Sequence, residues 1–135
     1  MPVSLIFQSE DRIAITVLEG VVTDAELLAA RHQVLTDPAF DPSYDRVWDF
    51  HAATHNQVSE AVAAQMIAES PNPGKSICRA VVLSAATAGL PPILRFIDGH
   101  RAIGRRIAAF PTRASALEWI KVARHDLPPE GTYPQ

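Results

Sequence analysis

The sequence predicts an α/β fold with a mixed, mostly parallel sheet of about five strands, an opening antiparallel hairpin and four helices. Two observations predict it: two β-rich stretches open the chain, and apolar stretches then alternate with segments of helical periodicity. The length of 135 residues, 47% of them hydrophobic, suffices for one self-sufficient core. We therefore expect one domain over residues 1–124 and a proline-rich tail over residues 125–135.

The opening hairpin is expected over Val3–Gln8 and Arg12–Glu19, where β-branched and aromatic residues dominate on both sides of a short polar turn. The first helix is expected over Asp24–Thr36. Its start is indicated by Thr23 and Glu26, which have the spacing of a capping box, and a proline just beyond the range ends it.

The middle of the chain is expected to add two strands and one helix. A short buried strand spans Arg46–His51, and Ile77–Ala85 has the continuous apolar character of a central strand. Ser59 is a suitable N-cap for a helix that ends near Glu69. The inward face of that helix is expected to carry Val62, Ala63, Met66 and Ile67.

The last third of the chain is expected to contain two helices with a strand between them. The third helix begins at Pro91 and Pro92, because proline fits the first helical turn. The strand Arg105–Phe110 follows, and Thr112 caps the last helix. The inward face of the third helix is expected to include Ile93, Phe96, Ile97 and Ile103, and that of the last helix Leu117, Trp119, Ile120 and Ala123.

Several stretches of the sequence carry a resemblance to a known family through their order and spacing. They are Leu18-Glu19-Gly20-Val21-Val22-Thr23, Asp37-Pro38-Ala39-Phe40, Arg46-Val47-Trp48-Asp49-Phe50, Phe110-Pro111-Thr112 and Ala116-Leu117-Glu118-Trp119-Ile120. With the order of the elements, they resemble the anti-sigma-factor antagonist (STAS) family, and in particular its SpoIIAA-like branch of small stand-alone bacterial proteins. The resemblance covers residues 3–124 and implies a STAS-like fold.

The resemblance also implies a candidate phosphorylation site. In signalling members of the family, a strand that ends in Asp precedes a helix whose first serine is phosphorylated by a partner kinase to break a protein complex. Asp49 and Ser59 occupy the matching positions here, whereas Val58 stands where those members carry Asp. A phosphate at a helix N-terminus meets unsatisfied N–H groups, while the structural alternative makes Ser59 a plain N-cap.

The densest polar cluster consists of Asp49, His51 and His55, just past the end of a predicted central strand, where ligands bind in parallel sheets. Two interpretations stay open: a ligand or partner site, or side chains that bond to the loop backbone. With Thr54, Asp49 and His51 would also form the candidate catalytic group of an enzyme. We expect no metal site, because a metal needs converging ligands and the segment from His51 to His55 is expected to be a loop without a common face.

Positive charge is concentrated around the third helix and the strand after it. The candidate surface consists of Arg95, Phe96, Arg101 and Arg105, flanked by His100 and Arg106. It suits an acidic protein partner or a phosphate-bearing ligand, and the structural alternative is a solvated helix face. Because the apolar residues of so short a helix cannot all point inward, at least one is expected on the surface, as at an interface.

Composition excludes several classes of protein. The formal net charge is −3, with two lysines and ten arginines, which gives no basic field for nucleic acid. No apolar run reaches the roughly 20 residues of a membrane helix, and no secretory segment is visible. The single cysteine, Cys78, cannot pair within the chain and is expected in the core. We therefore expect a cytoplasmic protein without a cofactor.

The resemblance and the character of the helices favour a non-enzymatic regulatory or protein-interaction module, similar to anti-sigma-factor antagonists. We expect a homodimer that meets a protein partner through the second and third helices, since the alanine-rich outer face of the second helix permits close approach. One alternative is a carrier of a small apolar or anionic ligand, such as a lipid-like molecule, held in an apolar pocket between the sheet and the third helix with arginines at its mouth. A second alternative is an enzyme that uses Asp49 and His51.

Overall fold

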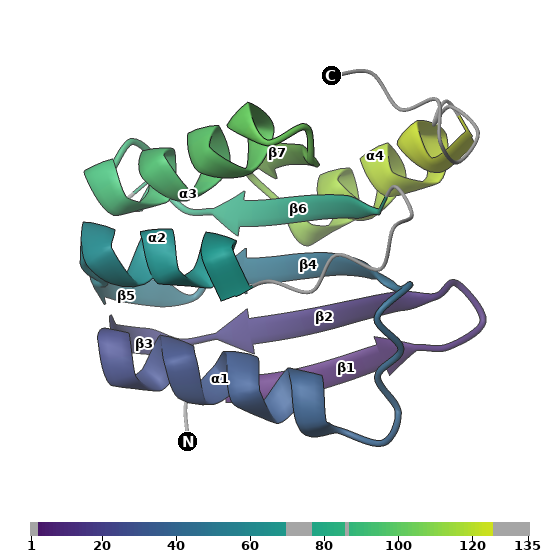
Figure 1. Cartoon of the computed structure of the whole chain (residues 1–135), viewed down its shortest axis with the longest axis horizontal. Coiled ribbons are helices and arrows are strands. Elements are labelled where there is room, and N and C mark those ends of the chain that lie inside the picture. The colour runs from purple at the N-terminus through teal and green to yellow at the C-terminus, as the bar shows by residue number, and fades with distance from the viewer. Residues whose placement is uncertain (1–2, 70–76, 86, 126–135) are drawn as a thin grey trace.

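Five strands form one mixed sheet in the order β1, β2, β4, β6, β7 (Figure 1). The structure is a computed structural model and describes residues 3–69, 77–85 and 87–125. The strands span Val3–Gln8, Ile13–Leu18, Asp45–Phe50, Cys78–Leu83 and Arg106–Phe110. β1 and β2 are antiparallel, and the other three neighbouring pairs are parallel. The predicted mixed sheet with an opening hairpin is therefore confirmed.

Three helices connect the parallel strands and a fourth follows the sheet. They span Asp24–Thr36 (α1), Glu60–Glu69 (α2), Pro91–Ala102 (α3) and Arg113–His125 (α4). α1, α2 and α3 pack on one face of the sheet, and α4 packs on the opposite face (Figure 1). Since α1 and α4 are the longest at 13 residues, no helix of the described segments has the length and apolar character needed to cross a membrane. The expected tail after α4 lies outside the described residues.

Side chains at the helix starts explain why these segments are helical. Thr23 Oγ1 accepts a hydrogen bond from Glu26 N at 3.2 Å and donates one to Glu26 Oε1 at 3.1 Å. Ser59 Oγ and Thr112 Oγ1 accept in the same way from the backbone N–H three residues on, at 3.2 and 3.1 Å. All three predicted N-caps are confirmed.

Alternation along the strands divides the core into two clusters, because neighbouring side chains of a strand point to opposite faces. In β4, Trp48 and Phe50 pack against α1, α2 and α3. Val47, which precedes Trp48 and points to the opposite face, packs on the side of α4. All six residues of β6 are buried, which confirms the predicted central strand. The cluster beneath α4 consists of Ile13, Ile15, Val17, Val47, Cys78, Ala80, Val82, Ala116, Ile120 and Ala123.

The structure contains a second, two-stranded sheet that the sequence analysis does not predict. β3 (Gly20–Thr23) pairs in parallel with β5 (Ala53–Gln57). The expectation of a loop from His51 to His55 is wrong, because this segment runs into β5. Gly20 adopts a left-handed backbone conformation (φ +70°) beside an irregularity in the pairing, which glycine tolerates without strain. Pairing with a distant strand supplies hydrogen-bond partners that the local pattern of residues does not reveal.

The inward face of α3 is shorter than expected. Ile93 and Ile97 are buried and Phe96 is half-buried, as predicted. Ile103 lies just beyond the end of the helix and is 57% exposed, so the expectation that it faces inward is wrong. Gly104 follows with a left-handed backbone (φ +80°) and redirects the chain towards β7.

Candidate functional site

Asp49 of the predicted polar cluster holds two parts of the fold together. It is buried near the end of β4 on the side of α4, and its Oδ2 accepts a hydrogen bond from Arg113 Nε at 2.8 Å. Its Oδ1 accepts from the backbone N of His51 at 2.9 Å. The Asp49 carboxylate therefore accepts a hydrogen bond from the loop backbone, which is the second of the two interpretations left open by the sequence. It also accepts one from Arg113 of α4.

The two histidines of the cluster lie apart from Asp49. His51 occupies a turn and His55 lies on β5, and both side chains are exposed. His55 Nδ1 lies 3.4 Å from Thr54 Oγ1, and no described hydrogen bond joins either imidazole to the Asp49 carboxylate. Within the described segments, no group of three or more histidine, cysteine or acidic side chains has an arrangement that would hold a metal ion.

Ser59 lies at the junction of α1 and α2. Its hydroxyl caps α2, and its backbone N donates a hydrogen bond to Asp24 Oδ1 at 2.7 Å, so the start of α2 is tied to the start of α1. The side chain is half-buried. A phosphate on Ser59 would place about two negative charges beside the Asp24 carboxylate, which opposes the attraction of the helix N-terminus.

The arginines of the predicted third-helix surface point in different directions. Arg95 and Arg101 are exposed, and Arg101 Nε donates to the carbonyl oxygen of Ile107 at 3.2 Å. Arg105 is half-buried and donates through Nη1 to the carbonyl oxygen of Ile67 at 3.1 Å and to His100 Nδ1 at 3.2 Å. The six residues therefore do not form one continuous surface.

A groove runs between α2 and α3 on the outside of the molecule. Its lining includes the small residues Ala64 and Ala68 of α2 and Gly99 of α3, together with Ile67 of α2. Two large apolar side chains border it and are largely open to solvent, Leu94 at 48% and Ile103 at 57% exposure. The prediction of an apolar side chain left on the surface of the third helix is confirmed. Glu60, Arg95 and Asp98 also line the groove.

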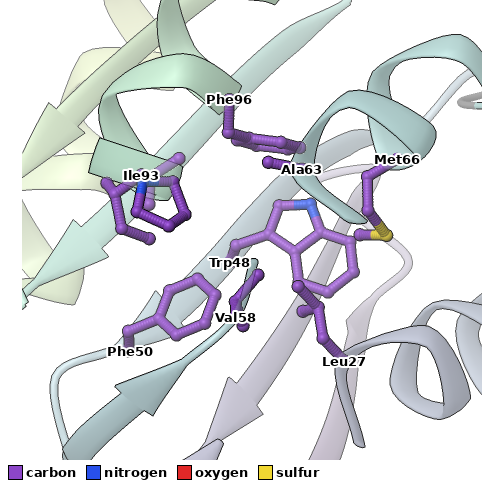
Figure 2. A pocket seen from close by; sticks show the side chains of 10 residues that line it. Leu27, Trp48, Phe50, Val58, Ala63, Met66, Ile93 and Phe96 are labelled. Carbon is purple, nitrogen blue, oxygen red and sulfur yellow. The ribbon is translucent and has the colours of Figure 1, made fainter. Parts of the chain in front are cut away.

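The apolar space beneath α3 is nearly filled by side chains. Figure 2 shows the Trp48 indole surrounded by Leu27 of α1, Met66 of α2, and Ile93 and Phe96 of α3. The cavity has a volume of about 20 Å³. A water molecule needs about 10–15 Å³, so this space has room for little more than one small group.

A cluster of three arginines and a histidine lies next to this space, and the sequence pattern does not predict it. Arg31 of α1, Arg46 of β4, Arg79 of β6 and His100 of α3 line one cavity of about 20 Å³. Arg46, Arg79 and His100 are 6%, 2% and 0% exposed. The sequence does carry a signal for two of them. Arg79 lies between Cys78 and Ala80, and Arg46 directly precedes Val47 and Trp48, in strands where an arginine is rarely fully buried unless it is paired.

The positive charges of this cluster act on one another. Burial first, and then the charges of Arg79, Arg105 and Arg46, together lower the pKa of His100 to about 3. Burial and the charge of Arg105 lower the pKa of Arg46 to about 10, against the opposing effect of Asp45. His100 is therefore a neutral imidazole at physiological pH, inside a positive electrostatic field.

Comparison with known proteins adds no relative to this description, since no protein-family model and no curated protein matches the sequence.

Proposed function

We propose that this protein is a non-enzymatic interaction module that forms a homodimer through the groove between α2 and α3. The observation that carries the proposal is the pair of exposed apolar side chains, Leu94 and Ile103. They lie beside the small residues that line the same groove, Ala64, Ala68 and Gly99. Contiguous exposed apolar surface marks interaction sites on proteins. The small side chains allow a helix of a partner to approach closely.

The charges of the groove favour a second copy of the chain as the occupant. Arg95 on α3 lies in the same groove as Glu60 on α2 and Asp98 on α3. In a two-fold symmetric interface, residue i of one copy contacts residue j of the other and the reverse contact also forms. Because the groove carries both signs of charge, two copies can form ion pairs across a symmetric interface. Arg95 of each copy would then lie near the acidic residues of the other copy.

The placement of the candidate catalytic residues supports a non-enzymatic role. Asp49 is buried and bonded to Arg113, whereas His51 and Thr54 are exposed on a turn and on β5. A general base has to lie within hydrogen-bond reach of the group it serves. The resemblance to anti-sigma-factor antagonists, whose signalling members act by forming and releasing protein complexes, also supports an interaction module.

The test is the mass of the protein in solution, measured by size-exclusion chromatography with light scattering at micromolar concentration. We expect twice the chain mass of 14.7 kDa. Leu94→Asp should give the single-chain mass, because a charge would be buried in the apolar contact. Val122→Asp is the matched control, since Val122 is 56% exposed on α4 across the sheet and its change should leave the dimer intact.

A charge exchange tests the symmetric arrangement. Arg95→Glu alone should weaken the dimer, and Arg95→Glu combined with Glu60→Arg should restore it, because opposite charges again face each other. A single-chain mass for the unaltered protein contradicts the proposal. So does a dimer that Leu94→Asp and Val122→Asp affect equally, because its interface would then lie elsewhere.

A further inference from the structure

The buried cluster of Arg31, Arg46, Arg79 and His100 has the composition of an anion site. These four residues come from α1, β4, β6 and α3, and all of them line the same cavity. The other described residues that line it are apolar, and none is acidic. Buried cations are normally paired or hydrogen-bonded, because removing a charge from water is costly. Arg46 Nη2, for example, donates to the carbonyl oxygen of Pro42 at 2.9 Å. The described lining of the cavity thus holds three arginines and no carboxylate.

The hydrogen bonding of His100 shows whether its imidazole presents a donor or an acceptor to the cavity. Arg105 Nη1 lies 3.2 Å from His100 Nδ1, and a guanidinium can only donate, so Nδ1 accepts. The neutral ring then carries its proton on Nε2. This buried Nε2 has no hydrogen-bond partner among the described residues, although the side chain is fully buried. His100 thus presents a donor that needs an acceptor.

Arg31 presents two more donors of the same kind. Its Nη2 donates to Glu69 Oε1 at 2.6 Å, at the side of the cluster that is nearest to solvent. Its buried Nε and Nη1 have no hydrogen-bond partner within the described part of the chain. The Arg31 side chain is 17% exposed and the Glu69 side chain 49%, so this pair lies where the cavity approaches the surface.

We propose that the cavity lined by Arg31, Arg46, Arg79 and His100 binds a small oxyanion, a phosphate or a carboxylate group. The donors of His100 and Arg31 match the acceptor oxygens of such a group, and arginine binds it in a two-point geometry. The volume of about 20 Å³ exceeds the roughly 10–15 Å³ that one water molecule needs, so a phosphate or carboxylate group enters only when the side chains around the cavity move apart. Burial is the largest cause of the lowered pKa of His100, and the charges of Arg79, Arg105 and Arg46, which an anion would neutralise, add to it.

The anion cavity differs from the groove between α2 and α3 in its place in the fold and in the chemistry of its lining. It lies inside the domain between the helices and the sheet, and shares no lining residue with the groove. It also differs from the apolar carrier pocket considered above, because its arginines come from α1 and the strands and not from the outer face of α3. Binding of an anion does not require the dimer, and the dimer does not require an anion.

The test measures stabilisation by inorganic phosphate and by acetate, in a chloride buffer held at constant ionic strength. A specific ligand raises the melting temperature with saturation, as expected for binding to the folded state alone. The probe with the lower half-saturation concentration identifies phosphate or carboxylate as the preferred group. Isothermal titration calorimetry should give one site per chain.

Two variants connect the binding to the cavity. Arg31→Met removes two inward donors and should weaken binding by about tenfold or more, the effect of one hydrogen bond to a charged group. Lys121→Met is the matched control: it removes the same charge from an exposed position on α4, and binding should not change. Equal stabilisation of both variants, or a rise without saturation, would mean a general salt effect and would overturn the proposal.

A measurement on the unaltered protein keeps the proposal testable if Arg31→Met does not fold. The imidazole of His100 should show a shifted Nε2–H resonance in NMR spectra when phosphate or acetate is added. The titration midpoint of His100 should also move upward from about 3, because an anion favours the imidazolium. Resonances of His100 that do not respond to either anion would contradict the proposal.

Discussion

Gly99 of α3 lies directly against Ile67 of α2. A Cβ atom at position 99 would lie 2.3 Å from Ile67 Cδ1, well inside contact distance. Glycine lowers the intrinsic stability of a helix, so its presence in the middle of α3 has a packing reason. The close contact sets the separation of the two helices that border the groove.

Gly99→Ala should change the stability of the protein little, because two effects oppose each other. Alanine gains about 1 kcal/mol in helix propensity, whereas Ile67 Cδ1, the end of a flexible side chain, has to turn aside for the new Cβ, at a cost of about 1 kcal/mol for a less favourable rotamer. We expect a change smaller than about 1 kcal/mol in the free energy of unfolding, measured by urea denaturation. In an Ile67→Val background Cδ1 is absent and the nearest remaining atom, Cγ1, lies at 3.6 Å. There the same change should stabilise by about 1 kcal/mol, and an equal effect in both backgrounds would disprove the contact.

His100 should make the stability depend on pH below neutrality. The pKa of this histidine is about 3 in the folded protein and 6.5 in its ordinary state. Between these values the unfolded chain binds a proton that the folded chain does not, so the free energy of unfolding falls as the pH falls. The loss is about 1.4 kcal/mol for each pH unit, or about 2 kcal/mol between pH 6.5 and 5. Urea denaturation in chloride buffers without multivalent anions measures it.

The control for this pH dependence is His100→Gln, which keeps hydrogen-bonding groups and does not ionise. Carboxylates also titrate in the lower part of this range, so the difference between the two proteins isolates the contribution of His100. That difference should shrink steadily from pH 6.5 to 5. Parallel stability curves for the two proteins would show that His100 titrates normally in the folded state.

Cys78 should be inert in the folded protein. Burial, with a smaller contribution from the charge of Asp45, raises the pKa of its thiol to about 12, and the side chain is fully buried beneath α4. Since the thiolate is the reactive form, a thiol reagent at about pH 8 should not label the native protein. Labelling should become complete in denaturant. Rapid labelling of the native state would contradict both the burial and the raised pKa.

Arg124 should contribute to stability through Asp45. The carboxylate is buried at the start of β4, where Oδ2 accepts from Arg124 Nε at 3.0 Å and Oδ1 accepts from the backbone N of Cys78 at 2.7 Å. Arg124→Met leaves this charge without a cationic partner. Because the arginine is 30% exposed, water replaces part of the interaction, and we expect a loss of about 1–2 kcal/mol rather than the 3–5 of a fully buried pair.

Removing the negative charge as well should recover part of this loss. Asp45→Asn in the Arg124→Met background no longer buries an unpaired charge, whereas Asp45→Asn alone leaves Arg124 without its partner. A double-mutant cycle in urea measures the coupling. If the two changes add without coupling, the ion pair has no energetic role.

Local signals were enough to predict most of the fold, because helix caps and apolar runs act within a few residues. Thr23, Ser59 and Thr112 cap helices where the sequence indicates, and Cys78–Leu83 is the buried strand that its apolar run predicts. The small β3–β5 sheet escaped prediction, because its strands are short and become stable only by pairing with each other.

The candidate sites were harder to predict, because their residues converge only in three dimensions. His51 and His55 are close in sequence, yet they lie apart from the buried carboxylate of Asp49. Conversely, Arg31 and His100 are far apart in sequence and line one cavity. Closeness in the sequence suggested a site at Asp49, His51 and His55, which the fold keeps apart. Arg31 and His100 come together only through the fold.

The position of α4 in the sequence determines when one face of the sheet becomes covered during synthesis. Among the described residues, α4 is the helix that covers its side of the sheet, and it follows β1 to β7 in the sequence. Synthesis proceeds from the N-terminus, so β2, β4 and β6 leave the ribosome before α4 does. Until Arg113 and Arg124 reach Asp49 and Asp45, the isoleucines and valines beneath them stay open to water and to chaperones.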